Sequence, residues 1–261
     1  MKPGPEENGQ SRFLHRVFTT VPPRYDLINH LMTLGKDIGW RGIAARESLA
    51  NAPEKALDLC CGTGDLALTM SALGGGKTKV LGIDYSRPML TKAAGKAARA
   101  GTPAPDFICG DTATLPFPDD CFDSVGISFA FRNLTYHNPL ARRYLAEVLR
   151  VLRKGGRFVI VESSRPGPRA RLVRWLHQAY VRHFVFRLGW LISGSRESYA
   201  YLADSVSHYY NAEELRKLLL EAGFGRVFFA RLFWGAAAIH VAIKLGRRLG
   251  KVDATSRFPS P

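Results

Sequence analysis

Ala56–Ala67 reads AlaLeuAspLeuCysCysGlyThrGlyAspLeuAla and determines the fold class of the chain. A short apolar run that holds Asp58 leads into a turn with Gly62 and Gly64, and a helix-forming segment follows. Glycine suits this turn because it adopts positive φ and lets a ligand approach the backbone. Open α/β sheets bind adenosine-containing cofactors at such a strand, turn and helix. We therefore expect a cofactor site at this turn.

Asp65, directly after the second glycine, bears on which cofactor binds. The Gly-x-Gly-x-x-Ala spacing also fits a dinucleotide site, where the pyrophosphate rests on the helix N-terminus and a carboxylate would repel it. S-adenosylmethionine has no phosphate, and its sulfonium and ammonium groups are cationic. Asp58 adds a second acid to the same rim, and Asp84, at the end of the next apolar run, can accept both ribose hydroxyls. The acids therefore favour S-adenosylmethionine. The alternative is that Asp65 only caps the helix and complements its dipole.

The composition is that of a globular protein. Of its 261 residues 46% are hydrophobic, which is enough for an ordinary core. No uninterrupted apolar run approaches the roughly 20 residues that span a bilayer, and the polar, Pro/Gly-rich N-terminus has no signal-peptide core. We expect a cytoplasmic protein with one domain over residues 11–246, between disordered ends at 1–10 and 247–261.

The cysteines do not predict a metal site. The chain has four, and the adjacent pair Cys60 and Cys61 lacks the CxxC spacing of zinc ligands. Because both lie in the cofactor turn, we interpret them as small side chains in a place where small side chains fit. No metal is therefore expected.

The net charge of +15 is concentrated in one part of the chain. Residues 140–190 hold 12 Lys and Arg but only two acids, Glu147 and Glu162, a net charge of +10. Such a segment suits an anionic membrane surface, a nucleic acid or an acidic substrate, and a solvated face explains it equally well. A non-catalytic nucleic-acid- or membrane-binding protein is thus an alternative, but the intact turn with Asp84 argues against it. We expect no nucleic-acid partner, and peripheral contact with the inner face of the cell membrane.

Strand and helix patterns alternate along most of the chain. Strands are expected at 56–60, 79–84, 107–108, 123–129, 158–162, 226–233 and 236–244. Two helices are expected within 11–50, and a third follows the glycine turn and ends at about residue 73. Further helices are expected at 88–100, 139–152 and 212–222. This alternation indicates a doubly wound, parallel sheet. Residues 165–210 interrupt the rhythm with an aromatic and basic helical pattern, which is either a lid beside the ligand crevice or part of the core.

Several strings resemble one family, the C-methyltransferases of ubiquinone and menaquinone biosynthesis. Besides the glycine turn they are TyrAspLeuIleAsnHisLeuMetThrLeuGly (25–35), LeuProPheProAspAspCysPheAsp (115–123), PheArgAsnLeuThr (131–135), ArgValLeuArgLysGlyGlyArg (150–157) and SerTyrAlaTyrLeu (198–202). The similarity covers residues 18–248. It implies a class I methyltransferase: a doubly wound, mostly parallel, seven-stranded, Rossmann-like sheet with N-terminal helices and a helical lid insertion.

The resemblance also implies cofactor contacts. In the family they fall on positions that match Thr63, Asp84, Asp111, Thr112 and Ser128. Together with Asp58, Gly62 and Gly64 of the turn, these residues form the expected S-adenosylmethionine site. Asp111 follows the third strand, where it can accept from the adenine amine.

The implied reaction is methylation of a ring carbon of a demethylated benzoquinol or naphthoquinol that carries a polyprenyl tail. A ring carbon becomes nucleophilic when the neighbouring hydroxyl, with a pKa of about 10, loses its proton. Arg132 stays protonated, so we assign it to stabilising the phenolate, with Asn133 positioning the hydroxyl or a bridging water. The alternative is that Arg132 pairs with a structural acid and Asn133 caps a turn.

Further substrate contacts are expected from Tyr25, His137, Tyr199 and Tyr201. We expect the proton to be taken by water or by a group such as His137 or Tyr25. The chain has Cys60, Cys61 and Ala130 where the family usually has smaller residues, which leaves the acceptor open. A phospholipid amine or a sterol is the alternative acceptor, and the oligomeric state stays open, a homodimer included.

Overall fold

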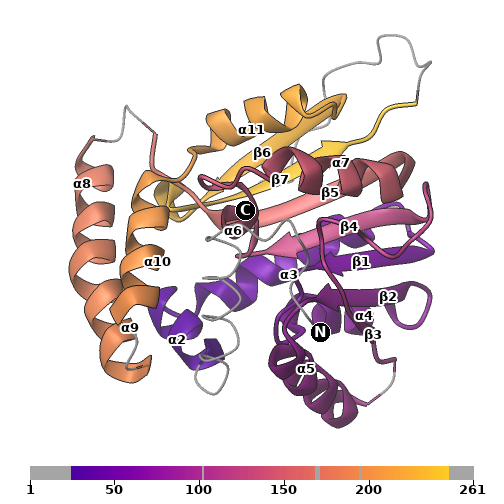
Figure 1. Cartoon of the computed structure of the whole chain (residues 1–261), viewed down its shortest axis with the longest axis horizontal. Coiled ribbons are helices and arrows are strands. Elements are labelled where there is room, and N and C mark those ends of the chain that lie inside the picture. The colour runs from indigo at the N-terminus through magenta and orange to yellow at the C-terminus, as the bar shows by residue number, and fades with distance from the viewer. Residues whose placement is uncertain (1–24, 102, 168–170, 194–195, 247–261) are drawn as a thin grey trace.

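The computed structural model describes residues 25–101, 103–167, 171–193 and 196–246, which form one seven-stranded sheet with helices around it (Figure 1). The strands are β1 (Lys55–Leu59), β2 (Lys79–Asp84), β3 (Asp106–Cys109), β4 (Phe122–Ser128), β5 (Leu152–Ser163), β6 (Arg226–Leu232) and β7 (Ala237–Ile243). They are ordered β3-β2-β1-β4-β5-β7-β6, and β7 runs antiparallel to both of its neighbours while the other pairs are parallel. The predicted doubly wound, mostly parallel sheet is confirmed.

The strand order reverses at β1, which lies between β2 and β4. The chain proceeds from β1 outward to β2 and β3, then returns to the other side of β1 to form β4 and β5. In open α/β sheets the crevice for a ligand opens at this reversal, outside the carboxyl ends of the strands. The turn after β1 is therefore at the place where a ligand crevice is expected.

Helices cover both faces of the sheet. In β5 the side chains of Phe158 and Ile160 join a core cluster with helices α7 (Ala141–Val151) and α11 (Ala212–Glu221). Val159 and Val161 join a second cluster with α3 (Lys36–Leu49) and α4 (Asp65–Gly74). Successive side chains of a strand point to opposite faces, and a strand that is buried on both faces therefore reads as the continuous apolar run seen in this sequence. Helix α5 (Arg87–Ala100) packs beside β2 and β3.

A short helix that the sequence analysis did not predict follows β4. It is α6 (Phe131–Thr135), and it begins after Phe129 takes a positive φ of 55°. The buried carboxylate of Glu162, at the end of β5, accepts a hydrogen bond from the backbone N–H of Arg132 at 3.0 Å. An anion at a helix start satisfies an unpaired N–H group and the helix dipole. Because this partner lies 30 residues away, local sequence could not reveal the helix.

Residues 165–210 form a group of helices at one end of the sheet. They are α8 (Arg171–Ala179), the π-helix η2 (Tyr180–Val185), α9 (Phe186–Ser193) and α10 (Arg196–His208), here called the lid helices. Figure 1 shows them standing together on the left, beside α2 (Tyr25–Met32). Among the described residues, none of the helices combines the length and the apolar character that crossing a bilayer requires. The predicted terminal segments 1–10 and 247–261 lie outside the described residues.

Candidate functional site

The turn after β1 is shaped by backbone conformations that favour glycine. Gly62 and Gly64 have φ of 54° and 83°. A side chain on Gly64 would lie 2.9 Å from the ring of Phe107 and 3.0 Å from Ala93, so this position requires glycine. A side chain on Gly62 would meet no atom within 4 Å, so there is open space beside the turn. The turn thus leaves open space beside its half-buried first glycine and packs tightly at its second.

Asp58 is the buried acid beneath the turn. One carboxylate oxygen, Oδ2, accepts from the N–H of Ala67 at 2.9 Å. The other, Oδ1, is buried and has no hydrogen-bond partner within the described residues. Burial raises the pKa of Asp58 well above its usual value. An unsatisfied buried carboxylate oxygen fits the ammonium group of S-adenosylmethionine, which would supply both a donor and a positive charge.

Asp84 joins the turn after β1 to the turn after β2. Its Oδ2 accepts from the N–H of Gly62 at 2.9 Å, and its Oδ1 accepts from the N–H of Ser86 at 2.8 Å. Burial raises the pKa of Asp84. Each carboxylate oxygen has a second lone pair, so Asp84 can still accept hydrogen bonds from a ribose.

The other predicted cofactor residues lie at the same edge of the sheet, because β3, β2, β1 and β4 end side by side. Thr63 is buried, and its hydroxyl donates to Asp26 at 2.7 Å. Asp111 is exposed and accepts from the N–H of Ala113, while Thr112 is buried. Ser128 is the last residue of β4 and is half-buried. The structure therefore brings all the predicted cofactor residues to one edge of the sheet.

Asp65 has a different environment from the one that its sequence position suggested. Its carboxylate lies 2.5 Å from Lys96 of α5 and 3.8 Å from Arg41 of α3. Its negative charge is thus balanced within the protein. Asp58, by contrast, has no ion pair within the described residues and keeps one buried oxygen without a partner. The basic residues that make this difference are distant from both acids in the sequence.

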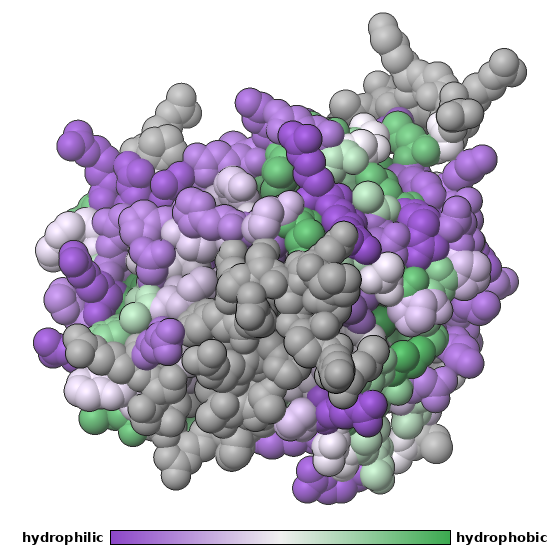
Figure 2. Space-filling model, in the orientation of Figure 1, coloured by the Kyte–Doolittle hydropathy of each residue, from purple (hydrophilic) through white to green (hydrophobic). Residues whose placement is uncertain are grey.

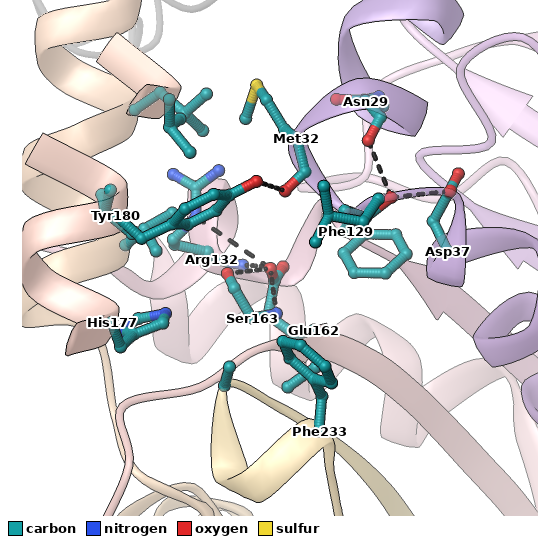
Figure 3. Close-up of a pocket in the computed structure, with 18 of the residues that line it drawn as sticks. Asn29, Met32, Asp37, Phe129, Arg132, Glu162, Ser163, His177, Tyr180 and Phe233 are labelled. Atoms are coloured by element: carbon teal, nitrogen blue, oxygen red, sulfur yellow. Dashed lines mark hydrogen bonds and ion pairs between the residues drawn. The ribbon is translucent and has the colours of Figure 1, made fainter. Parts of the chain in front are cut away.

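A cavity of about 850 Å³ lies at the carboxyl ends of β4 and β5, between the lid helices and helices α2 and α3. Most of its walls are apolar or aromatic, including Met32, Trp40, Phe129, Leu176, Tyr180 and Phe233. Figure 3 shows Tyr180 reaching across it, where its hydroxyl donates to the carbonyl of Met32 at 3.0 Å. This volume is in the range of pockets for whole small-molecule ligands.

Arg132 connects three elements at the cavity wall. Its backbone binds Glu162 of β5, and its Nη1 donates to the hydroxyl of Ser205 in α10. Its Nε lies 4.0 Å from Glu162 and makes no hydrogen bond within the described residues. Arg132 therefore does pair with a structural acid, and it also lines the cavity with unused donor capacity.

Asn133, Tyr199 and Tyr201 also line the cavity, so the structure brings these predicted residues together with Arg132. His137 does not line it: its ring is exposed and packs against Tyr136. Tyr25 is the first residue of α2, and its side chain lies outside the described residues.

Several polar residues of the cavity wall were not predicted as site residues, among them Glu162, Ser163 and His177. Glu162 had a signal, since it is one of only two acids in the basic segment and it ends a buried strand. His177 had a weaker signal: its spacing from Val173 and Tyr180 places the three residues on one face of a helix.

Comparisons with known proteins agree with this geometry. The model of the ubiE/COQ5 methyltransferase family matches residues 6–244. The chain is 40% identical over 225 residues to the demethylmenaquinone methyltransferase of Thermus thermophilus, covering 86% of this chain and 98% of that one. It is 34% identical over 239 residues to the ubiquinone/menaquinone biosynthesis C-methyltransferase UbiE of Pseudomonas fluorescens, covering 91% of each.

A solved structure supports the fold. The crystal structure of a SAM-dependent methyltransferase from Thermotoga maritima matches with a TM-score of 0.56 at 17% identity, covering 89% of this chain and 96% of that one. The fold is that of the Rossmann-like class I methyltransferases, as the resemblance predicted. With an acid-lined turn that fits the methyl donor and a family match over almost its whole length, the chain belongs to the ubiE/COQ5 methyltransferase family and is an S-adenosylmethionine-dependent methyltransferase.

Proposed function

We propose that this enzyme methylates a ring carbon of a polyprenyl quinol, a demethylated naphthoquinol or benzoquinol, in respiratory quinone biosynthesis. The observation that supports this most is the apolar cavity beside the cofactor crevice, with Arg132 and Asn133 in its wall. An isoprenoid tail suits apolar walls, and the ring hydroxyls need the few polar groups. The names of the relatives from Thermus thermophilus and Pseudomonas fluorescens point to the same substrate class.

The cofactor would be held by the crevice residues. We assign Asp58 to its ammonium group, Asp84 to its ribose and Asp111 to its adenine. Gly62, Thr63, Gly64, Thr112 and Ser128 would complete the walls around it. When bound, S-adenosylmethionine supplies an activated methyl group on a positively charged sulfur.

Arg132 would stabilise the phenolate form of the quinol. Its guanidinium stays protonated, so it supplies positive charge and does not take the proton. Glu162 and Ser205 hold it in place from β5 and α10, so its position is set before the substrate binds. Donors that are positioned in advance and directed at developing negative charge are an effective form of catalysis. Asn133 would orient the hydroxyl that ionises.

Incubation with labelled methyl donor and a reduced quinol tests the proposal. Demethylmenaquinol and a demethylated ubiquinol precursor are compared, and mass spectrometry locates the new methyl group. We expect a carbon-methylated ring with one of the two. Exclusive transfer to a phospholipid amine or a sterol, or to no acceptor at all, would overturn the proposal.

Arg132→Ala tests the role of Arg132. It should lower kcat by about 10²–10³-fold, as loss of one oxyanion donor does, while titration calorimetry shows nearly unchanged binding of the methyl donor. Arg153→Gln is the matched control, because Arg153 pairs with Asp123 at the other end of the sheet. Equal kcat in wild type and Arg132→Ala would remove Arg132 from the mechanism.

We further propose peripheral contact with an anionic membrane through the lid helices. Trp175 and Leu191 are 64% and 75% exposed there, and Arg171, Arg182 and Arg187 are exposed beside them. Figure 2 shows hydrophobic side chains at the lower left, at the foot of the lid helices, on a largely hydrophilic surface. Exposed aromatic residues beside arginines suit a bilayer surface with negative lipids.

Sedimentation with vesicles tests this contact. Binding should need phosphatidylglycerol in the vesicle, weaken with salt, and fall in the double variant Trp175→Ser with Leu191→Ser. Leu73→Ser, which changes an exposed leucine of α4, is the control. Binding that depends on neither lipid charge nor salt would contradict the proposal.

A further inference from the structure

We propose that His177 is the base that accepts the phenolic proton of the quinol. This inference rests on the proposed function. His177 belongs to α8, the first of the lid helices, and it lines the cavity. Figure 3 shows its ring projecting from the lid side into the space that Arg132, Ser163 and Phe233 border.

The imidazole of His177 has unused capacity for a hydrogen bond. Its Nδ1 is buried and has no hydrogen-bond partner within the described residues. An unsatisfied buried polar group is unfavourable, so a partner that satisfies it is stabilising. Its neighbours on the cavity side of α8, Val173 and Leu176, are apolar. A hydroxyl of a bound ring would supply the missing partner.

The other titratable groups that line the cavity come from α3, α6, β5, η2 and α10: Asp37, Arg132, Glu162, Tyr180, Tyr199 and Tyr201. The two carboxylates are already engaged. Asp37 binds His30, Thr33 and Arg41, and Glu162 accepts from Ser163 and from the backbone of Arg132.

The remaining groups are one arginine and three tyrosines. A guanidinium has no lone pair with which to accept a proton, and a phenol acts as a donor at neutral pH. Tyr180 in addition donates to Met32, and burial raises its pKa. His177 thus offers a buried ring nitrogen without a hydrogen-bond partner within the described residues, and an imidazole can accept a proton at neutral pH.

Burial also prepares His177 for this role. It lowers the pKa of the imidazole below its usual value of 6.5. A lowered pKa means that the ring is neutral at pH 7 and can accept a proton. The sequence analysis considered His137 and Tyr25 for this step, but the ring of His137 lies outside the cavity.

The proton and electron balance is as follows. The O–H proton of the quinol moves to His177, and the electron pair of that bond stays on oxygen as a phenolate. The ring carbon then uses a ring electron pair to bond to the methyl group, and the carbon–sulfur bond breaks with its electron pair left on sulfur. The methylated carbon loses its own proton to solvent, and the oxygen takes a proton back from His177. One proton is released for each methyl group transferred.

Steady-state kinetics with His177→Gln tests the inference. We expect kcat to fall by about 10²–10³-fold, the usual contribution of a general base, with a smaller change in KM. The rise of kcat with pH below about 7 should disappear in the variant. Added imidazole should restore part of the rate of His177→Ala. His183→Gln, which changes an exposed histidine of η2, should behave as wild type.

A second readout needs no turnover. The absorbance of 1-naphthol bound to the donor-free protein reports the ionisation of the naphthol hydroxyl. The apparent pKa of bound 1-naphthol should be lower in the wild type than in His177→Gln. Calorimetric binding of the methyl donor and the melting temperature show whether a variant is folded. If His177→Gln is misfolded, His177→Asn replaces it in both experiments.

The outcomes separate the two proposals. A wild-type enzyme that methylates the quinol, together with a His177→Gln variant of equal kcat and pH profile, overturns the role of His177 alone. A wild-type enzyme without activity on either quinol overturns the proposed function, and the role of His177 with it.

Discussion

Asp58 shows how a single residue can serve binding at the expense of stability. Its carboxyl is buried, one oxygen lacks a partner within the described residues, and burial raises its pKa. In the folded protein the charged form is therefore disfavoured, so ionised Asp58 destabilises the ligand-free state at neutral pH. A cationic ligand would relieve this cost. Binding and stability should therefore respond in opposite directions when the charge is removed.

Asp58→Asn should raise the Tm of the ligand-free protein and weaken binding of S-adenosylmethionine by about 10–100-fold, the value of a charge-assisted hydrogen bond. The amide oxygen can still accept from Ala67, whereas the amide nitrogen cannot accept from an ammonium group. Differential scanning fluorimetry and titration calorimetry measure the two effects. Asp106→Asn, at an exposed acid of β3, is the control. A variant with lower Tm and unchanged affinity would contradict this view of Asp58.

At the scale of elements, the lid helices are tied to the rest of the molecule across the cavity. Tyr180 of η2 donates to the last residue of α2, Met32. Ser205 of α10 accepts from Arg132 of α6. Both contacts border the cavity, so the position of the lid and the shape of the site depend on each other.

Tyr180→Phe should loosen this connection without changing the shape of the side chain. One neutral hydrogen bond is worth about 0.5–1.5 kcal/mol, so KM for the quinol should rise by about 2–10-fold with a smaller change in kcat. Limited proteolysis should also cut the lid helices faster. Thr91→Val, which removes a side-chain hydrogen bond within α5 instead, is the control. Identical KM and cleavage rates in Tyr180→Phe and wild type would exclude a role of this bond.

At the scale of the whole molecule, buried titratable groups set the pH dependence of folding. Burial lowers the pKa of His240 to about 4, from a usual 6.5. The unfolded chain therefore binds more protons between these values, and the free energy of unfolding falls as the pH drops through this range. Asp58 and Asp84 act in the opposite direction, because burial raises their pKa values and protonation removes a buried charge.

His240→Gln isolates the histidine contribution. Between pH 7 and pH 4 the wild type should lose about 3 kcal/mol more unfolding free energy than the variant, from the difference between the two pKa values. Urea denaturation at a series of pH values measures this. His208→Gln, an exposed histidine, should keep the wild-type slope. Parallel pH profiles for His240→Gln and wild type would show that His240 does not titrate as described.

The parts of the fold that the sequence predicted correctly depend on local signals, and so does the placement of the expected cofactor residues. The strand and helix periods indicated the seven strands, and the positive φ that glycine allows marked the turn at Gly62 and Gly64. The alternation also placed Asp84 at a strand end. The sequence did not reveal α6, because its start depends on Glu162, a partner 30 residues away.

The sequence by itself determined the family, the sheet and the edge at which the expected cofactor residues meet, because glycine turns, strand ends and periodicity depend on consecutive residues. Only the tertiary structure decided which of the similar side chains face the site. It paired Asp65 with Lys96 and Arg41 and left Asp58 with a free oxygen, and it placed His177 inside the cavity. The reason is physical: the charge balance and burial of a side chain are set by neighbours that folding brings together from distant parts of the chain.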